Sequence, residues 1–193
     1  MQLEEIFPQL SEIENQDVRK KTERVLEEAV AQSSWSDIRD IPYIMSWTLR
    51  VSEGTNLVEH TKLVTDIAIF MARRMTATGL FRINMDELVS AAILHDIGLV
   101  HEFERDPKGG IRKRYGRTLI RHPIWSGFLA VKHGLSPTIA HIISAHSREG
   151  DYTERTVEAT ILYHADWTPY ECLQAQEKGA MPSGHSPSRT TSP

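Results

Sequence analysis

A series of histidine and aspartate residues, spread over more than half of the chain, constrains how it can fold. They recur at intervals of 35, 26, 24 and 20 residues with one adjacent pair, and they are His60, His95, Asp96, His122, His146 and Asp166. Each lies in a stretch with the apolar spacing of a helix. Imidazole and carboxylate groups bind divalent metals such as iron, manganese, zinc and nickel. We therefore expect several helices to bring these side chains together around two metal ions that share a carboxylate.

The composition suits one domain with a buried core. The chain has 193 residues, 40% of them hydrophobic, and its net charge of −4 argues against a general polyanion binder. The single cysteine, Cys172, excludes an internal disulfide and fits a reducing compartment. The start, MQLEEIFPQL, is acidic and lacks an apolar segment, so we expect no signal peptide. No run approaches the roughly 18 apolar residues of a membrane span. We expect a cytoplasmic protein without a membrane partner.

Hydrophobic periodicity predicts an all-α fold of about six helices, with a small β-hairpin near 100–117. Two helix starts are marked by capping residues, Asn84 followed by Glu87, and Ser136 followed by Pro137. Adjacent residues of a helix point about 100° apart. His95 and Asp96 can therefore face one site only where their helix ends, and we expect Gly98 to end it.

Five sequence blocks occur in a fixed order over about residues 55 to 170: EHTKLV, AAILHDIG, RHPIWSGFLAV, ISAHSREG and ILYHADW. In this order they resemble the HD-domain metal-dependent phosphohydrolase superfamily. They are most similar to its two-metal, HDIG-type subset, which includes diadenosine-tetraphosphate hydrolases and HD-GYP catalytic cores. We expect the chain to divide into an N-terminal helical extension packed on the core (1–55), an HD domain (56–176) and a disordered tail (177–193). The tail is expected from its composition, because a segment rich in Pro, Ser, Gly and Thr buries too little apolar surface to become ordered.

The resemblance also implies a ligand set. One metal ion would be held by His60, His95, Asp96 and Asp166, and a second by Asp96, His122 and His146. Asp96, His122 and His146 would thereby be catalytic, with Asp96 bridging the ions beside an activated hydroxide. Iron or manganese is the expected metal, with nickel, cobalt and zinc as the other candidates. The implied activity is that of a phosphomonoesterase or phosphodiesterase that cleaves a phosphate ester or anhydride of a small molecule, expected to be a nucleotide.

Two positions depart from the family pattern. Many two-metal members carry a lysine three residues after the doublet aspartate, where it helps to hold a phosphate, and Leu99 stands there in this chain. A GYP motif is absent, and Asn56 occupies the position where some HD-GYP members have a glutamate. Cyclic-dinucleotide hydrolysis and a third metal ion are therefore not expected.

A basic segment that leads into His122 could replace the missing lysine. It contains six cations and no acid: Lys108, Arg112, Lys113, Arg114, Arg117 and Arg121. We predict that substrate phosphate binds to Arg117, Arg121, Lys113 and, just after His146, Arg148. The alternative is a solvated hairpin whose charges only keep a sheet edge soluble. His101 could also replace the lysine, although a histidine at a strand edge is the simpler interpretation.

Three classes of function remain open at this point. The first is the phosphohydrolase. The second is an HD-domain mixed-valent di-iron oxygenase, since imidazole and carboxylate also suit that chemistry and the lysine is absent. The third is a non-catalytic regulator that binds a nucleotide. Nucleic acid is not an expected partner, because the basic run is short and aromatic residues are not interleaved with it. A homodimer formed through the first 55 residues is a further hypothesis.

Overall fold

The computed structural model describes residues 3–41, 43, 56–115 and 119–179, with side chains up to residue 176. Its α-helices are α1 (Leu3–Ile6), α2 (Gln16–Ala31), α3 (Leu57–Thr76), α4 (Met85–Leu94), α5 (Leu99–Glu102), α6 (His122–Lys132), α7 (Pro137–Ser144) and α8 (Val157–Gly179). Short 3-10 helices cover Pro8–Glu12, Ile38–Asp40 and Arg148–Tyr152. The all-α fold class is confirmed, and six of these α-helices exceed a single turn in the described part of the chain.

The expected hairpin is present but small. Strand β1 (Phe103–Arg105) pairs antiparallel with β2 (Ile111–Lys113), and Phe103 lies opposite Lys113. Gly109 and Gly110 in the connecting turn have positive φ values of 96° and 86°, which favour glycine. The residues before β1, Leu99–Glu102, form the helix α5 rather than part of the hairpin.

Side-chain caps start several helices where the sequence predicts them. Asn84 accepts a hydrogen bond from the backbone N–H of Glu87, and Ser136 accepts one from Ile139. Asn56 does the same for α3, by accepting from the N–H of Glu59 at 2.9 Å. Asn56 therefore begins a helix.

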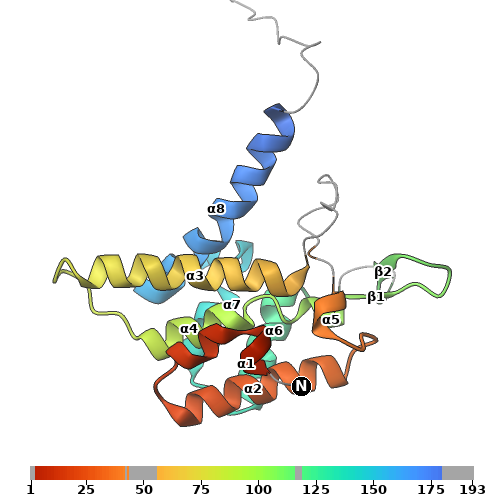
Figure 1. The fold of residues 1–193 in the computed structure, drawn as a ribbon, viewed down its shortest axis with the longest axis horizontal. Coiled ribbons are helices and arrows are strands. Elements are labelled where there is room, and N and C mark those ends of the chain that lie inside the picture. Colours follow the sequence, from red (N-terminus) through yellow and green to blue (C-terminus); the bar gives the residue numbers. More distant parts are fainter. Residues whose placement is uncertain (1–2, 42, 44–55, 116–118, 180–193) are drawn as a thin grey trace, which may run out of the picture.

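Helix α4 lies at the centre of the bundle, where α2, α3, α7 and α8 all contact it (Figure 1). Residues 88–94 of α4 are buried on every side, as expected of a helix without a solvent-facing stripe. The small residues Ala91 and Ala92 let the neighbouring helices approach closely. This packing holds the end of α4, where His95 and Asp96 follow, deep inside the molecule.

The N-terminal residues share the core of the rest. Leu10, Leu26 and Ile38 are fully buried, and the hydroxyls of Thr22 in α2 and Ser90 in α4 lie 2.7 Å apart in the interior. The division into an extension, an HD domain and a tail stays a prediction. Helix α8 extends from the bundle (Figure 1) and continues to Gly179, so the first three residues of the expected tail are helical. Residues 180–193 lie outside the described residues.

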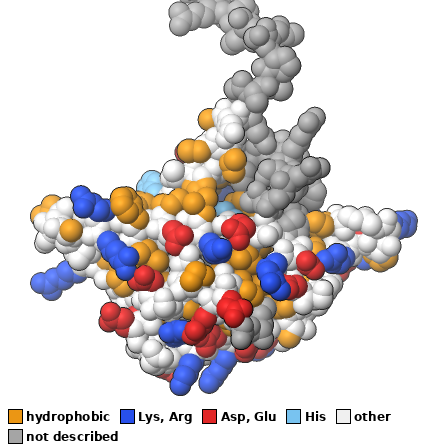
Figure 2. All heavy atoms as spheres, in the orientation of Figure 1, with side chains coloured by type: hydrophobic (Ala, Val, Ile, Leu, Met, Phe, Trp, Pro, Cys, Tyr) orange, Lys and Arg blue, Asp and Glu red, His pale blue; other side chains and the backbone are white. Residues whose placement is uncertain are grey.

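Acidic and basic side chains alternate over the face shown in Figure 2, in keeping with the small net charge. Across the described segments, no helix is both long and apolar enough to cross a membrane.

Candidate metal centre

Four imidazole rings surround the carboxylate of Asp96 and divide its two oxygens between them. Oδ2 lies 3.4 Å from Nε2 of His60 and 3.5 Å from Nε2 of His95. Oδ1 lies 3.1 Å from Nε2 of His122 and 3.5 Å from Nε2 of His146. One carboxylate therefore faces two separate pairs of imidazoles.

The second carboxylate, Asp166, joins the first of these pairs. Its Oδ1 lies 3.1 Å from Nε2 of His60 and 3.7 Å from Nε2 of His95. Potential ligand atoms lie within 4.8 Å of one another in three groups, which are His60–His95–Asp96, His95–His146–Asp166 and Asp96–His122–His146. All six residues that the sequence singles out thus lie together, while their assignment to two separate ions stays a prediction.

Helix ends position most of these side chains. His95 is the C-terminal cap of α4 with Asp96 directly after it, and His122 is the first residue of α6. His146 follows the end of α7, whereas His60 and Asp166 lie within α3 and α8. His95 keeps helical backbone angles of φ −55° and ψ −41°, and the side chains of both His95 and Asp96 nevertheless face the centre.

The hydrogen bonds of the rings orient their Nε2 atoms toward the centre. Nδ1 of His95 lies 2.7 Å from the carbonyl oxygen of Ala92, and Nδ1 of His146 contacts that of Ile143. A carbonyl only accepts, so these Nδ1 atoms carry the proton and the Nε2 lone pairs face inward.

The inward-facing nitrogens lack enough protein donors. His146 Nε2 is buried and has no hydrogen-bond partner in the described part of the chain, and Nε2 atoms of His60 and His95 face each other at 3.2 Å. Lone pairs packed this closely need a cation or protons between them. The cluster therefore fits divalent metal ions, and its mixture of imidazole and carboxylate suits iron, manganese, nickel, cobalt or zinc.

The electrostatics of the bare cluster reflect the same arrangement. Burial opposes a charge on His95, but the Asp96 and Asp166 carboxylates outweigh it and raise the pKa of His95 to about 9. Burial would raise the pKa of Asp96, yet His95 and His122 hold it well below its usual range. Burial lowers the pKa of His146.

Two residues beside the cluster have no signal in the sequence. The ring of Tyr43 stacks on His60, with centroids 3.7 Å apart and planes 12° from parallel. Glu102, at the end of α5, accepts a hydrogen bond from the backbone N–H of His122, and its Oε2 lies 3.3 Å from Nδ1 of the same residue. Both come from segments whose position beside the cluster depends on how the helices pack.

The contacts of Arg155 also have no signal in the sequence. Its guanidinium donates to the carbonyl oxygens of Ala145 at 2.8 Å and Ser147 at 3.1 Å, and it lies over the ring of Tyr163 at 4.2 Å. These contacts tie the segment that carries His146 to helix α8.

Gly98 has a different role from the expected one. Its φ of −62° is ordinary for a helix, so it does not end α4 by adopting a left-handed conformation. Instead, a methyl group at Gly98 would lie 2.4 Å from the carbonyl oxygen of His122 and 2.8 Å from Cβ of Trp125. The N–H of Gly98 donates to Ser126 Oγ at 2.8 Å. A glycine is needed because α6 approaches the backbone here, and this contact sets the position of His122.

The predicted phosphate-binding residues do not converge in the same way. Arg117 lies outside the described residues. Arg121 is 42% exposed and pairs with Glu149 at 3.1 Å. Lys113 is half-buried on β2, and Arg148 is exposed in the 3-10 helix after His146. Their role in substrate binding stays a prediction.

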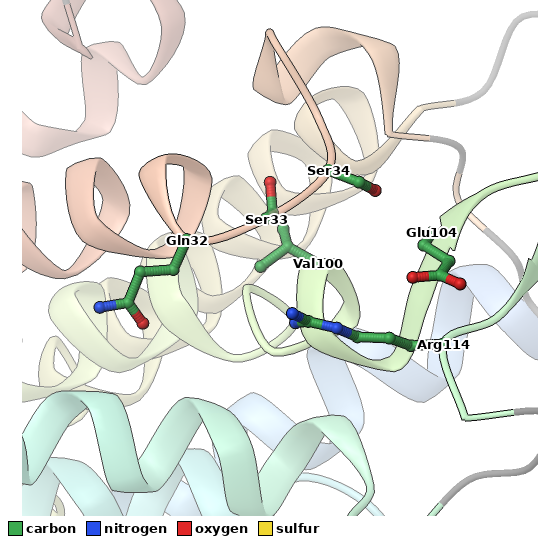
Figure 3. Close-up of a pocket in the computed structure, with 6 residues that line it drawn as sticks. All are labelled: Gln32, Ser33, Ser34, Val100, Glu104 and Arg114. Atoms are coloured by element: carbon green, nitrogen blue, oxygen red, sulfur yellow. The ribbon is translucent and has the colours of Figure 1, made fainter.

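Arg114 borders a cavity of about 160 Å³ beside the hairpin, shown in Figure 3. Its lining residues are Gln32, Ser33, Ser34, Val100, Glu104 and Arg114, and none belongs to the metal cluster. Arg114 Nη1 lies 3.4 Å from Nδ1 of His101. His101 is buried in α5, so it is not the strand-edge histidine that the sequence suggests. Burial, followed by the charge of Arg114, lowers its pKa.

Comparison with known proteins places these features in a family. The family model of the HD domain matches residues 57–169, and this range includes all six cluster residues. A dihydroneopterin 2′,3′-cyclic phosphate phosphodiesterase from Methanocaldococcus jannaschii is 24% identical over 170 residues, covering 85% of this chain and 67% of that protein. A ribonuclease Y from Desulforudis audaxviator is 31% identical over 119 residues, covering 61% of this chain but 19% of that protein. A ribonuclease Y from Salinispora arenicola is 25% identical over 162 residues, and the chain spans 24% of its length. No solved structure matches the chain significantly.

Proposed function

Because the chain belongs to the HD domain family, we propose that it is a metal-dependent phosphodiesterase acting on a small phosphorylated molecule. The observation that carries this proposal is the division of the Asp96 carboxylate between two imidazole pairs. In the proposed arrangement, one ion would be held by His60, His95, Asp96 and Asp166. A second ion would be held by Asp96, His122 and His146.

Two divalent ions held by these residues would supply an activated water as the nucleophile and would stabilise the charge that develops on the phosphate. The residues around the cluster fix the orientation of its histidine rings. The Ala92 and Ile143 carbonyls fix the orientation of His95 and His146, and Tyr43 covers one face of His60. Because the cluster is buried, its charges act in a medium that screens them less than water does.

The names of the relatives support a narrower substrate class for this proposal. The archaeal protein is named for the hydrolysis of a 2′,3′-cyclic phosphate, and the two ribonucleases are named for RNA. A phosphodiester is common to these substrates. We therefore place a small 2′,3′-cyclic phosphate, of a nucleoside or a pterin, ahead of the broader class of nucleotides.

Arg148 is the strongest candidate to hold the substrate phosphate. It follows His146 by two residues, is exposed, and has no carboxylate within ion-pair distance in the described segments. Arg121, in contrast, is neutralised by Glu149. The proposal therefore gives Arg148 the main role and Arg121, Arg117 and Lys113 supporting ones.

The test combines metal content with a matched substrate panel. Protein purified without chelator should contain about two ions per chain, and Asp96→Ala should lose them. The panel compares 2′,3′-cyclic nucleotides and dihydroneopterin 2′,3′-cyclic phosphate with the corresponding monoesters. Hydrolysis of a cyclic diester by the wild type, absent from Asp96→Ala, supports the proposal. A metal-loaded wild type that hydrolyses only monoesters contradicts the diesterase assignment, and one that hydrolyses neither contradicts the function.

One observation favours a second candidate, the mixed-valent di-iron oxygenase. Leu99 is 4% exposed and packs into the core, so no cation takes the place of the phosphate-binding lysine at that position. Iron-loaded protein that consumes oxygen with a candidate substrate, and shows the spin signature of a mixed-valent pair, would support this reaction over hydrolysis. The in vivo metal, a cytoplasmic location and a homodimer stay predictions.

A further inference from the structure

Two cluster histidines are oriented by their own helices. Nδ1 of His95 meets the carbonyl of Ala92, and Nδ1 of His146 meets the carbonyl of Ile143. In each case the acceptor is three residues earlier, in the last turn of the helix that the histidine follows. The free carbonyls at a helix C-terminus are suited to this use.

His122 cannot be oriented in the same way. It is the first residue of α6, and Arg121 before it is the N-terminal cap with an extended backbone. No helical turn precedes it, so no carbonyl three residues earlier is available from its own helix. Its Nδ1 needs an acceptor from another part of the chain.

Glu102 supplies that acceptor. Its Oε2 lies 3.3 Å from Nδ1 of His122 and accepts the backbone N–H of the same residue at 3.1 Å. The two side chains are only 9% and 15% exposed. One carboxylate oxygen thus fixes both the start of α6 and the ring of its first residue.

The backbone of Glu102 is held on both sides. Its N–H donates to the carbonyl of Gly98 at 3.3 Å, and its own carbonyl accepts the N–H of Arg114 at 3.1 Å. The carboxylate is therefore presented by a fixed turn between α4 and the hairpin. It does not depend on a mobile side chain alone.

We propose that Glu102 is a positioning residue that keeps the proton of His122 on Nδ1 and aims Nε2 at the metal site beside Oδ1 of Asp96. A carboxylate behind a ligating imidazole fixes its tautomer and makes the ligand more basic, which a carbonyl does less strongly. Ala92 and Ile143 offer neutral carbonyls to Nδ1 of His95 and His146, whereas Glu102 offers a charged carboxylate to Nδ1 of His122. The inference rests on the proposed two-ion function. It predicts that Glu102 orients a ligand of the ion held by His122 and His146, and no ligand of the other ion.

The consequence is a selective effect on one ion. Replacing a carboxylate that orients a ligand typically weakens metal affinity about 10- to 100-fold. Glu102→Ala should weaken the ion held by His122 and His146 by this amount, and should leave the ion held by His60, His95 and Asp166 unchanged. Glu102→Gln retains an acceptor without the charge and should lie between Glu102→Ala and the wild type.

The experiment is a cobalt titration of chelator-treated protein, followed by visible absorption and calorimetry. Glu104→Gln is the matched control, because Glu104 is two residues away and pairs with Arg112 on the hairpin. A zinc-loaded sample provides a second measurement, the Nδ1–H resonance of His122 in a proton–nitrogen spectrum. In Glu102→Ala this resonance should shift and exchange faster with water, whereas a general loss of stability would not alter it selectively.

The outcomes separate the two proposals. Loss of affinity at one site with the other preserved, together with the changed His122 resonance, supports the role of Glu102. If the wild type binds two ions and Glu102→Ala leaves both affinities unchanged, or weakens both equally, the role of Glu102 is overturned and the proposed function stands. A wild type that binds fewer than two ions overturns the two-ion function, and the role of Glu102 with it.

Discussion

The metal cluster and the basic segment are both concentrations of functional residue types, but the structure treats them differently. The cluster side chains are 0% to 17% exposed, and their ligand atoms face one another. In the basic segment, Arg112 and Arg121 are 52% and 42% exposed, and each pairs with a glutamate that lies outside that segment. Buried groups must have their charges matched, whereas exposed cations can be neutralised by any nearby acid. The spaced series of histidines and aspartates therefore predicted which side chains lie together, whereas the run of like charges predicted no such grouping.

The largest expected effect is the loss of the cluster through its shared carboxylate. Asp96→Ala removes the group that faces both imidazole pairs, so we expect both ions and all measurable hydrolysis to be lost. Metal analysis and activity assays measure this. Asp17→Ala is the control, since Asp17 is an exposed carboxylate that pairs with Lys21 on α2. Retention of one tightly bound ion by Asp96→Ala would contradict the shared role.

The second effect is on the stability of the metal-free protein at alkaline pH. The folded pKa of His95 is raised to about 9, so the stabilisation from its proton is complete below about 6.5 and is lost as pH rises through 9. The melting temperature of chelator-treated protein should fall by several degrees between pH 7 and pH 9.5, because about 1 kcal/mol shifts a chain of this size by about 2–4 °C. His95→Asn should remove this dependence. An equal fall in that variant would assign the effect to other groups.

The third effect concerns the approach of α6 to Gly98. Gly98→Ala places a methyl group 2.4 Å from the carbonyl of His122, so α6 must shift and His122 with it. Overpacking of this kind costs about 1–3 kcal/mol. We expect weaker binding of the ion beside His122, measured by cobalt titration. Gly79→Ala is the control, because its positive φ of 75° destabilises the backbone without crowding any atom. Equal metal binding by both variants would contradict the positioning argument.

The smallest effects should come from the cations, and they should differ. Arg148→Ala is expected to raise KM about tenfold, because it removes one hydrogen bond to a charged phosphate oxygen and such bonds contribute about 1.5 kcal/mol or more. Arg121→Ala should raise KM less than Arg148→Ala does, because Arg121 already pairs with Glu149 at 3.1 Å and is less available to a substrate phosphate. Steady-state kinetics on one cyclic phosphate measure both. A larger effect for Arg121 than for Arg148 would restore the basic segment as the main phosphate site.

The sequence by itself determined the helices and the identity of the cluster. Apolar spacing and capping residues such as Asn84 and Ser136 act within one or two turns, so they can be interpreted without knowing the fold. The histidines and aspartates were recognisable because their side-chain chemistry and order are specific. Gly98 was noticed for the wrong reason, since a glycine that ends a helix and a glycine that admits a neighbouring helix look alike in sequence.

Tertiary structure decided which groups meet. Glu102 reaches His122 across 20 residues, Arg121 reaches Glu149 across 28, and Tyr43 stacks on a ring of α3. These contacts depend on how the helices pack around α4, and no local propensity encodes that packing. Burial makes these contacts important for the chemistry. A carboxylate strongly changes the proton affinity of a neighbouring imidazole only where water is excluded. The candidate ligands were therefore visible in the sequence, and their orientation and electrostatics became visible only in the fold.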